Sequence, residues 1–109
     1  MANFVPLENA NGLDALYAAS HERPVLLFKH SLTCPVSADA YREMSQYPGQ
    51  VELVVVQTAR AVADAIESRS GIRHESPQAI VLSQGGPVWN ASHWKITTEA
   101  VSAAVDANR

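Results

Sequence analysis

Two short apolar runs separated by one helical segment constrain the fold of this 109-residue chain more than any other feature. Residues 24–29 and 51–56 are too short for stable helices, and such continuous runs are typical of strands covered on both faces. Between them, Val36, Ala40 and Met44 recur at intervals of four, which predicts a helix with one buried face. A strand, a helix and a strand in this order predict a β-α-β unit with parallel strands and a right-handed crossover.

Capping residues define two further helices. Asn9 or Asn11 can cap a helix that we expect from about residue 11 to residue 20. Thr58 can cap a second helix, which should end near residue 70 because Gly71 can adopt the left-handed conformation that terminates helices. One helix is therefore expected before the β-α-β unit and one after it.

The last part of the chain predicts a β-hairpin and a final helix. Residues 79–82 and 87–89 lie on either side of a Gln-Gly-Gly turn, which favours an antiparallel hairpin. Pro87 cannot donate to a sheet ladder, so it favours an edge position for the second strand. Thr97 or Thr98 can cap the last helix, which should pack on the sheet through Val101, Ala104 and Val105.

The composition excludes several classes of function. The net charge is −3 and the eight Lys and Arg residues are scattered, so we expect no nucleic-acid partner. No run approaches the ~18 apolar residues of a spanning helix, and residues 1–4 lack the basic start of a signal peptide. We therefore expect a cytoplasmic protein with no membrane partner, folded as a single domain over residues 1–109. The lone cysteine cannot form an internal disulfide or supply a zinc site, so no metal is expected.

That cysteine, Cys34, is expected at the N-cap of the helix in the β-α-β unit, because Pro35 is favoured at the first helical position. A helix N-terminus stabilises a thiolate, which is the nucleophilic form of the side chain. Ser37 can add a hydroxyl hydrogen bond, and Lys29 and His30 can add positive charge, although strand alternation can turn one of them away. The alternative is that Cys34 is an inert small hydrophobic residue.

Taken together, the element order and the place of the cysteine resemble a thioredoxin-fold protein, an α/β fold with a mixed central sheet flanked by helices. Cys34-Pro35-Val36-Ser37 is similar to the Cys-x-x-Cys of thioredoxins and glutaredoxins, with serine in place of the second, resolving cysteine. Ser76-Pro77 before a strand resembles the cis-proline segment of that fold, so Pro77 is predicted to be cis. A cis bond there would leave the backbone of Ser76 free for a substrate.

A closer resemblance covers most of the chain. Its motifs are Leu27-Phe28-Lys29-His30-Ser31, Thr33-Cys34-Pro35, Ser37-Ala38, Tyr41-Arg42-Glu43, His74-Glu75-Ser76-Pro77-Gln78, Ala91-Ser92-His93-Trp94 and Ile96-Thr97. Together they resemble the YtxJ family, the monothiol bacilliredoxins of bacteria that use bacillithiol. The resemblance implies a thiol-disulfide oxidoreductase in which Cys34 removes bacillithiol, a low-molecular-weight thiol co-substrate, from mixed disulfides on client proteins. A separate thiol must then resolve the Cys34 adduct, because the chain has no second cysteine.

The predicted site combines the motifs with the helix-start chemistry. Cys34 and Ser37 are the predicted catalytic residues. The predicted substrate-binding residues are Lys29, His30, Thr33, Pro35, Ser76, Pro77, His93 and Trp94. The glycine-rich acidic segment with which glutaredoxins grip glutathione is absent, and residues 91–95 stand in its place. We expect His93, Trp94 and the N-terminus of the last helix to help bind an anionic low-molecular-weight thiol.

Two other functions remain open at this point. The chain can be a redox-inactive, thioredoxin-like adapter of a stress response that docks partners at the Pro77 groove without turnover. It can also be an oxidoreductase that acts with a different small thiol. Iron-sulfur cluster binding is known for monothiol glutaredoxins with the motif Cys-Gly-Phe-Ser. It is a less favoured hypothesis here, because this chain has Pro35 and Val36 at the two middle positions.

Overall fold

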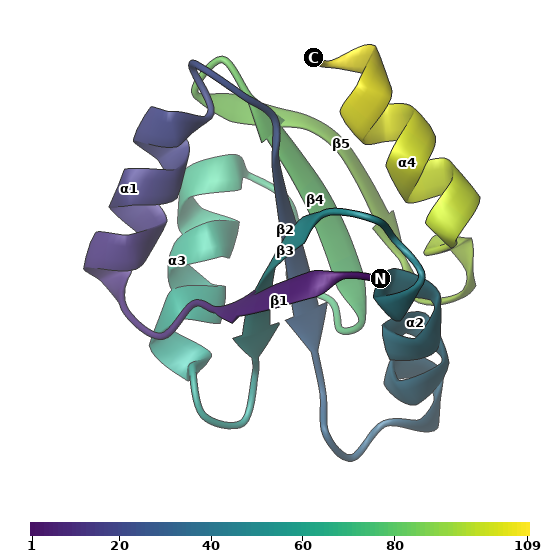
Figure 1. Cartoon of the computed structure of the whole chain (residues 1–109). Helices are drawn as coiled ribbons and strands as arrows, with labels where there is room; N and C mark the ends of the chain where they lie inside the picture. The colour runs from purple at the N-terminus through teal and green to yellow at the C-terminus, as the bar shows by residue number, and fades with distance from the viewer.

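A five-stranded mixed sheet forms the centre of the computed structural model, which describes residues 1–109 (Figure 1). The strands are β1 (Asn3–Pro6), β2 (Val25–His30), β3 (Gln50–Val55), β4 (Gln78–Ser83) and β5 (Gly86–Ser92). Their order across the sheet is β1-β3-β2-β4-β5. β3 pairs in parallel with both β1 and β2, whereas β4 is antiparallel to β2 and β5. The predicted parallel pair, the hairpin and the edge position of its second strand are confirmed.

Two helices cover each face of the sheet. The helices are α1 (Ala10–Ala19), α2 (Pro35–Ser45), α3 (Arg60–Ser70) and α4 (Thr98–Ala107), and a short 3-10 helix, η1 (His93–Lys95), links β5 to α4. Figure 1 shows α1 and α3 on one face and α2 and α4 on the other. None of these helices is long and apolar enough to cross a membrane.

The alternation of side chains along β2 explains why the sheet needs cover on both faces. β2 and β4 are buried along their whole lengths. Val25 and Leu27 pack into a core with α1 and α3, and Leu26 and Phe28 pack into a second core with α2 and α4. Successive strand residues point to opposite faces, so each apolar run supplies both cores at once.

The first strand was not predicted from the sequence. β1 is only four residues long, which is too short to show alternation, and Pro6 ends it. Its register with β3 decides its conformation, because Phe4 pairs with Val51 and Leu7 N–H donates to Leu53 O at 2.8 Å. The strand β1 therefore forms because it pairs with β3, and its own sequence contains no pattern that predicts a strand.

The helix caps agree with the sequence except at α3. Asn9 rather than Asn11 caps α1 and accepts a hydrogen bond from Gly12 N–H at 2.8 Å, so the helix begins one residue early. Thr58 is not the cap of α3: Ala59 is the N-cap residue and has no side-chain acceptor. Gly71 ends α3 in the left-handed region, with φ 74°, as predicted.

Candidate functional site

The register of the sheet brings the predicted site residues to one edge. His30 at the end of β2 pairs with Val55 at the end of β3, and Gln78 at the start of β4 pairs with Ser92 at the end of β5. Gln78 also lies opposite Lys29 on β2. The loop before Cys34, the segment before β4 and the turn into η1 therefore meet at the same edge.

Cys34 is the N-cap residue of α2, as predicted. Its backbone is extended, with φ −103° and ψ 120°, and Pro35 follows at the first helical position. The side chain is half-buried, and the Cys34 carbonyl accepts the first helical hydrogen bond from Ala38 N–H at 3.1 Å. The Cys34 side chain accepts no hydrogen bond from the first turn in this structure. A helix N-terminus nevertheless favours a thiolate, because its N–H groups have no intrahelical partner.

Ser37, one turn after Cys34, is fully buried and bonded to two other residues. Its Oγ accepts a hydrogen bond from Ser31 N–H at 2.9 Å and lies 2.8 Å from His30 Nδ1. These bonds tie the first turn of α2 to the end of β2. Thr33 is exposed, and its hydroxyl lies 3.4 Å from Ser31 Oγ.

His30 and Lys29 point to opposite faces of the sheet, as strand alternation requires. Burial lowers the pKa of His30, so the imidazole is neutral at neutral pH and does not add the positive charge that we expected. Lys29 is fully buried on the face covered by α3. Burial lowers the pKa of Lys29 to about 8, against the opposing effect of carboxylates led by Glu67 on α3. The Lys29 ammonium group therefore lies on the face of the sheet that α3 covers. Cys34 lies at the start of α2, which covers the opposite face (Figure 1).

Gln57, just after β3, positions the loop before the cysteine and was missed by the sequence analysis. Its Oε1 accepts from Leu32 N–H at 3.1 Å, and its Nε2 donates to Ser31 Oγ at 2.8 Å and lies 3.4 Å from Thr33 Oγ1. One amide thus contacts three successive residues. Its place directly after a predicted parallel strand was the available signal, because such strands end at the same edge.

The Ser76–Pro77 peptide bond is cis, as predicted. Pro77 is buried, and its carbonyl accepts a hydrogen bond from His93 N–H at 3.1 Å, which holds the start of η1 against this segment. Ser76 is half-buried, and its backbone N–H and C=O have no hydrogen-bond partner within the chain. An extended substrate backbone can therefore pair with Ser76.

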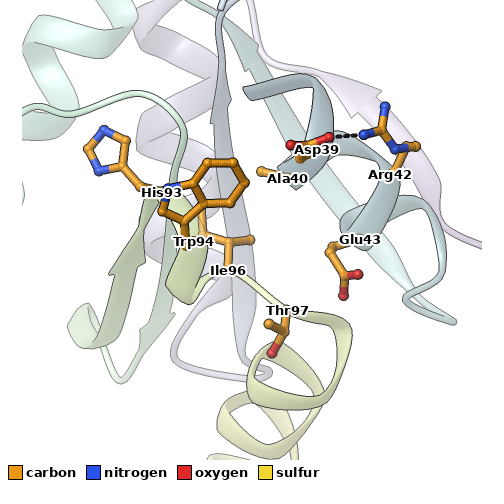
Figure 2. Close-up of a pocket in the computed structure, with 8 residues that line it drawn as sticks. All are labelled: Asp39, Ala40, Arg42, Glu43, His93, Trp94, Ile96 and Thr97. Carbon is orange, nitrogen blue, oxygen red and sulfur yellow. Dashed lines mark ion pairs between the residues drawn. The ribbon is translucent and has the colours of Figure 1, made fainter. Parts of the chain in front are cut away.

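His93 and Trp94 both line two open cavities, and Figure 2 shows the one that lies beside α2. The indole is 68% exposed and extends toward Ala40, whereas the His93 ring points away from the cavity drawn in the figure. That first cavity, of about 310 Å³, is lined by Asp39, Ala40, Arg42, Glu43, His93, Trp94, Ile96 and Thr97. The second, of about 470 Å³, is lined by Glu75, Asn90, Ala91, Ser92, His93, Trp94 and Lys95.

The N-terminus of α4 is already capped from within the chain, which corrects the expectation that it receives an anionic ligand. Thr98 N–H donates to Glu43 Oε1 at 2.9 Å, and Ala100 N–H donates to the Thr97 hydroxyl at 3.1 Å. The Glu43 carboxylate therefore already occupies the positive N-terminus of α4, where an anionic ligand would bind. The cationic groups at these cavities are instead Arg42, which is paired with Asp39, and Lys95.

We compared the chain with protein families and with solved structures. A family model described as "Monothiol bacilliredoxin BrxC" matches residues 5–101. A solved protein described as a candidate oxidoreductase with a thioredoxin fold is 28% identical, with a TM-score of 0.85 over 93% of this chain and 92% of that chain.

Thioredoxins share the fold at lower identity. A thioredoxin variant from Halobacterium salinarum is 15% identical, with a TM-score of 0.73 over 97% of this chain and 90% of its own. Schistosoma mansoni thioredoxin is 14% identical, with a TM-score of 0.70 over 98% of this chain and 99% of its own. The predicted thioredoxin-like fold is confirmed. No group of three or more His, Cys, Asp or Glu side chains is arranged to hold a metal ion.

Proposed function

Because the chain belongs to the monothiol bacilliredoxin family, we propose that it removes bacillithiol from mixed disulfides on client proteins through Cys34. Family and fold make the chain a thioredoxin-like redox protein. The observation that carries the finer proposal is the position of its only cysteine, half-buried at the N-cap of α2 and at the same edge of the sheet as cis-Pro77.

The proposed reaction is a thiol-disulfide exchange in two steps. The Cys34 thiolate attacks the bacillithiol sulfur of the mixed disulfide, a new Cys34–bacillithiol disulfide forms, and the protein sulfur leaves as a thiolate that takes up a proton. A second, external thiol then attacks the bacillithiol sulfur of the adduct and releases the Cys34 thiolate. The client is reduced and the external thiol is oxidised, so electrons balance without a metal or a second cysteine in this chain.

The neighbouring residues have proposed roles that follow from their positions. Ser37 holds the first turn of α2 and, with Cys34, forms the catalytic pair. Ser76 pairs with the backbone of the client beside its disulfide, and buried cis-Pro77 shapes that contact. Thr33 and Pro35 flank the thiol and contact the disulfide as it approaches.

The two cavities at Trp94 are the proposed site for the low-molecular-weight thiol. Trp94 offers an exposed aromatic wall, and His93 lines both cavities. Lys95 supplies the positive charge that attracts an anionic group of the thiol. Lys29 lies on the α3 side, so any effect of its charge on the substrate acts through the field rather than through contact.

The intact mass of the protein after incubation with oxidised bacillithiol tests the proposal directly. We expect one bacillithiol adduct on Cys34, formed faster than the adduct from oxidised glutathione, and no adduct on a Cys34→Ser variant. The Cys34→Ser variant should also fail to release bacillithiol from a modified client. If neither disulfide forms an adduct, the thiol is shielded and the chain is better described as a thioredoxin-like adapter.

A further inference from the structure

The cavity that Glu75 and Lys95 line differs in charge from its neighbour beside α2. In the neighbouring cavity Arg42 is paired with Asp39, and the Glu43 carboxylate caps α4. Those charged groups are therefore already bonded within the chain. In the cavity of about 470 Å³, by contrast, Glu75 and Lys95 are both exposed and neither forms an ion pair. This cavity offers a ligand one anionic and one cationic group that no ion pair neutralises.

The turn at His93 connects the two sides of this cavity. His93 lies in the left-handed region, with φ 55°, which few residues other than glycine adopt. Its N–H donates to Pro77 O at 3.1 Å, and its carbonyl accepts from Ile96 N–H at 3.2 Å. The first bond joins η1 to the segment that contains Glu75, and the second closes the 3-10 turn that contains Lys95. The two charged side chains therefore extend from one hydrogen-bonded unit of backbone.

The carboxylate of Glu75 stays ionised and keeps free acceptor sites. A hydrogen bond from the Ser92 side chain lowers the pKa of Glu75, and nearby cationic groups lower it further. An ionised carboxylate has about four acceptor positions, so one hydrogen bond leaves most of them available. Hydrogen bonds from a cationic donor to a carboxylate are stronger than neutral ones. Glu75 can therefore accept hydrogen bonds from a ligand ammonium group.

Glu75 is the neighbour of Ser76, at the edge of the sheet where the reacting thiol lies. Gln78 pairs with Lys29 in the antiparallel ladder of β2 and β4. The chain before Gln78 therefore runs alongside the chain that leads from Lys29 to Cys34. The unpaired backbone groups of Ser76 lie on this stretch and are the proposed contact for a substrate backbone. The adjacent Glu75 carboxylate can therefore contact a group that lies a few bonds from the reacting sulfur.

We propose that Glu75 is a specificity-determining residue that selects thiols with a free amine two carbons from the sulfur. Its carboxylate accepts hydrogen bonds from that ammonium group while Cys34 exchanges with the sulfur. Bacillithiol carries such an amine on its cysteinyl unit, whereas the cysteinyl nitrogen of glutathione is part of an amide bond. Glu75 thus discriminates between these two thiols, and Lys95 contacts the anionic end of bacillithiol in the same cavity. The inference rests on the proposed function only in taking Cys34 as the reacting thiol.

Two small disulfides that differ in whether their amines are free test this selection. Cystamine carries free ammonium groups, and N,N′-diacetylcystamine carries none. The Cys34 thiolate attacks one sulfur of either compound, forms a mixed disulfide and releases the other half as a thiolate that takes up a proton. We expect Glu75→Gln to slow adduct formation with cystamine about fivefold, which corresponds to about 1 kcal/mol, and to leave the rate with the diacetyl compound unchanged. The intact mass of the protein at successive times measures both rates.

Glu22→Gln is the matched control, because it changes the net charge by the same amount. Glu22 is exposed just before β2, at the end of that strand opposite to Cys34, and lines none of the cavities. We expect this variant to react like the wild type with both disulfides. A wild-type rate with cystamine in Glu75→Gln, or an equal loss of rate with both disulfides, would overturn the inference.

Oxidised bacillithiol and oxidised glutathione separate the inference from the proposed function. Glu75→Gln should slow formation of the bacillithiol adduct and reduce the preference for bacillithiol over glutathione. A bacillithiol adduct that forms equally fast in the wild type and in Glu75→Gln would overturn the inference and leave the proposed function intact. A cystamine rate that depends on Glu75, in a protein that forms no bacillithiol adduct, would support the inference and remove the proposed function.

Discussion

At the scale of single residues, Ser37 has a structural task that the Cys-x-x-Ser motif does not reveal. Its hydroxyl accepts from Ser31 N–H inside the protein, so removing it leaves a buried donor without a partner. We expect Ser37→Ala to reduce the free energy of unfolding by about 1 to 3 kcal/mol. It should slow bacillithiol exchange without abolishing it, because Cys34 remains.

Urea unfolding and exchange rates measured on the same Ser37→Ala preparation check this prediction. Ser68→Ala on the exposed surface of α3 is a matched control that should change neither quantity. A Ser37→Ala protein of wild-type stability would mean that Ser31 N–H finds another partner, and the role assigned to this hydroxyl would be wrong.

Residue-level prediction from the sequence succeeded where local chemistry decides the outcome. Pro35 after Cys34 predicted the helix start, and Ser76-Pro77 before a strand predicted the cis bond. It failed where an effect depends on residues distant in the chain. The neutral state of His30 comes from burial under Tyr41 and Phe28, and no local pattern contains that information.

At the scale of elements, the loop between β2 and α2 depends on a loop that follows a different strand. Gln57 holds three successive residues of this loop through one amide. We expect Gln57→Ala to slow exchange several-fold while changing the free energy of unfolding by no more than about 1 kcal/mol, because the side chain is exposed. The loss should come from poorer positioning of Cys34.

Gln57→Glu separates the two ends of that amide. The carboxylate keeps an acceptor for Leu32 N–H but loses the donor to Ser31 Oγ, so its exchange rate should lie between wild type and Gln57→Ala. Steady-state exchange on a bacillithiol-modified client, with thermal melting of all three proteins, measures both effects. Equal rates for all three proteins would show that the loop holds its conformation without Gln57.

The elements themselves were predicted to the extent that each carries a local signal. The apolar residues of α2 recur at intervals of four, β2 and β3 are short continuous apolar runs, and the Gln-Gly-Gly turn marks the hairpin. β1 has four residues and exists through its pairing with β3, and the cap of α4 is shared with Glu43 on α2. The strand β1 and the cap of α4 both depend on contacts between segments about fifty residues apart, so neighbouring residues in the sequence cannot predict them.

At the scale of the whole molecule, a buried lysine connects stability to pH. Lys29 is fully buried and its Nζ has no hydrogen-bond partner, and its pKa is lowered to about 8 in the fold. An unfolded lysine titrates near 10.4, so between about pH 8 and about pH 10 the unfolded chain binds more protons than the folded one. Stability should therefore rise with pH across this range, until the ionisation of Tyr17 and Tyr47, whose pKa values burial raises, reverses the trend.

Replacing Lys29 by methionine, which has a similar shape, should remove this dependence. We expect Lys29→Met to increase the free energy of unfolding at neutral pH by about 1 to 4 kcal/mol, because it removes a buried charge that has no hydrogen-bonded partner. Urea unfolding at about pH 7 and about pH 9.5 measures how the free energy of unfolding changes with pH in the wild type and in Lys29→Met. Lys95→Met, on the exposed η1, is the control and should show the same increase with pH as the wild type. A Lys29→Met protein that is less stable than the wild type at neutral pH would contradict this prediction. It would mean that attraction to the carboxylates of Glu67, Asp64 and Glu75 outweighs the cost of burying the ammonium group, so that the charge stabilises the fold.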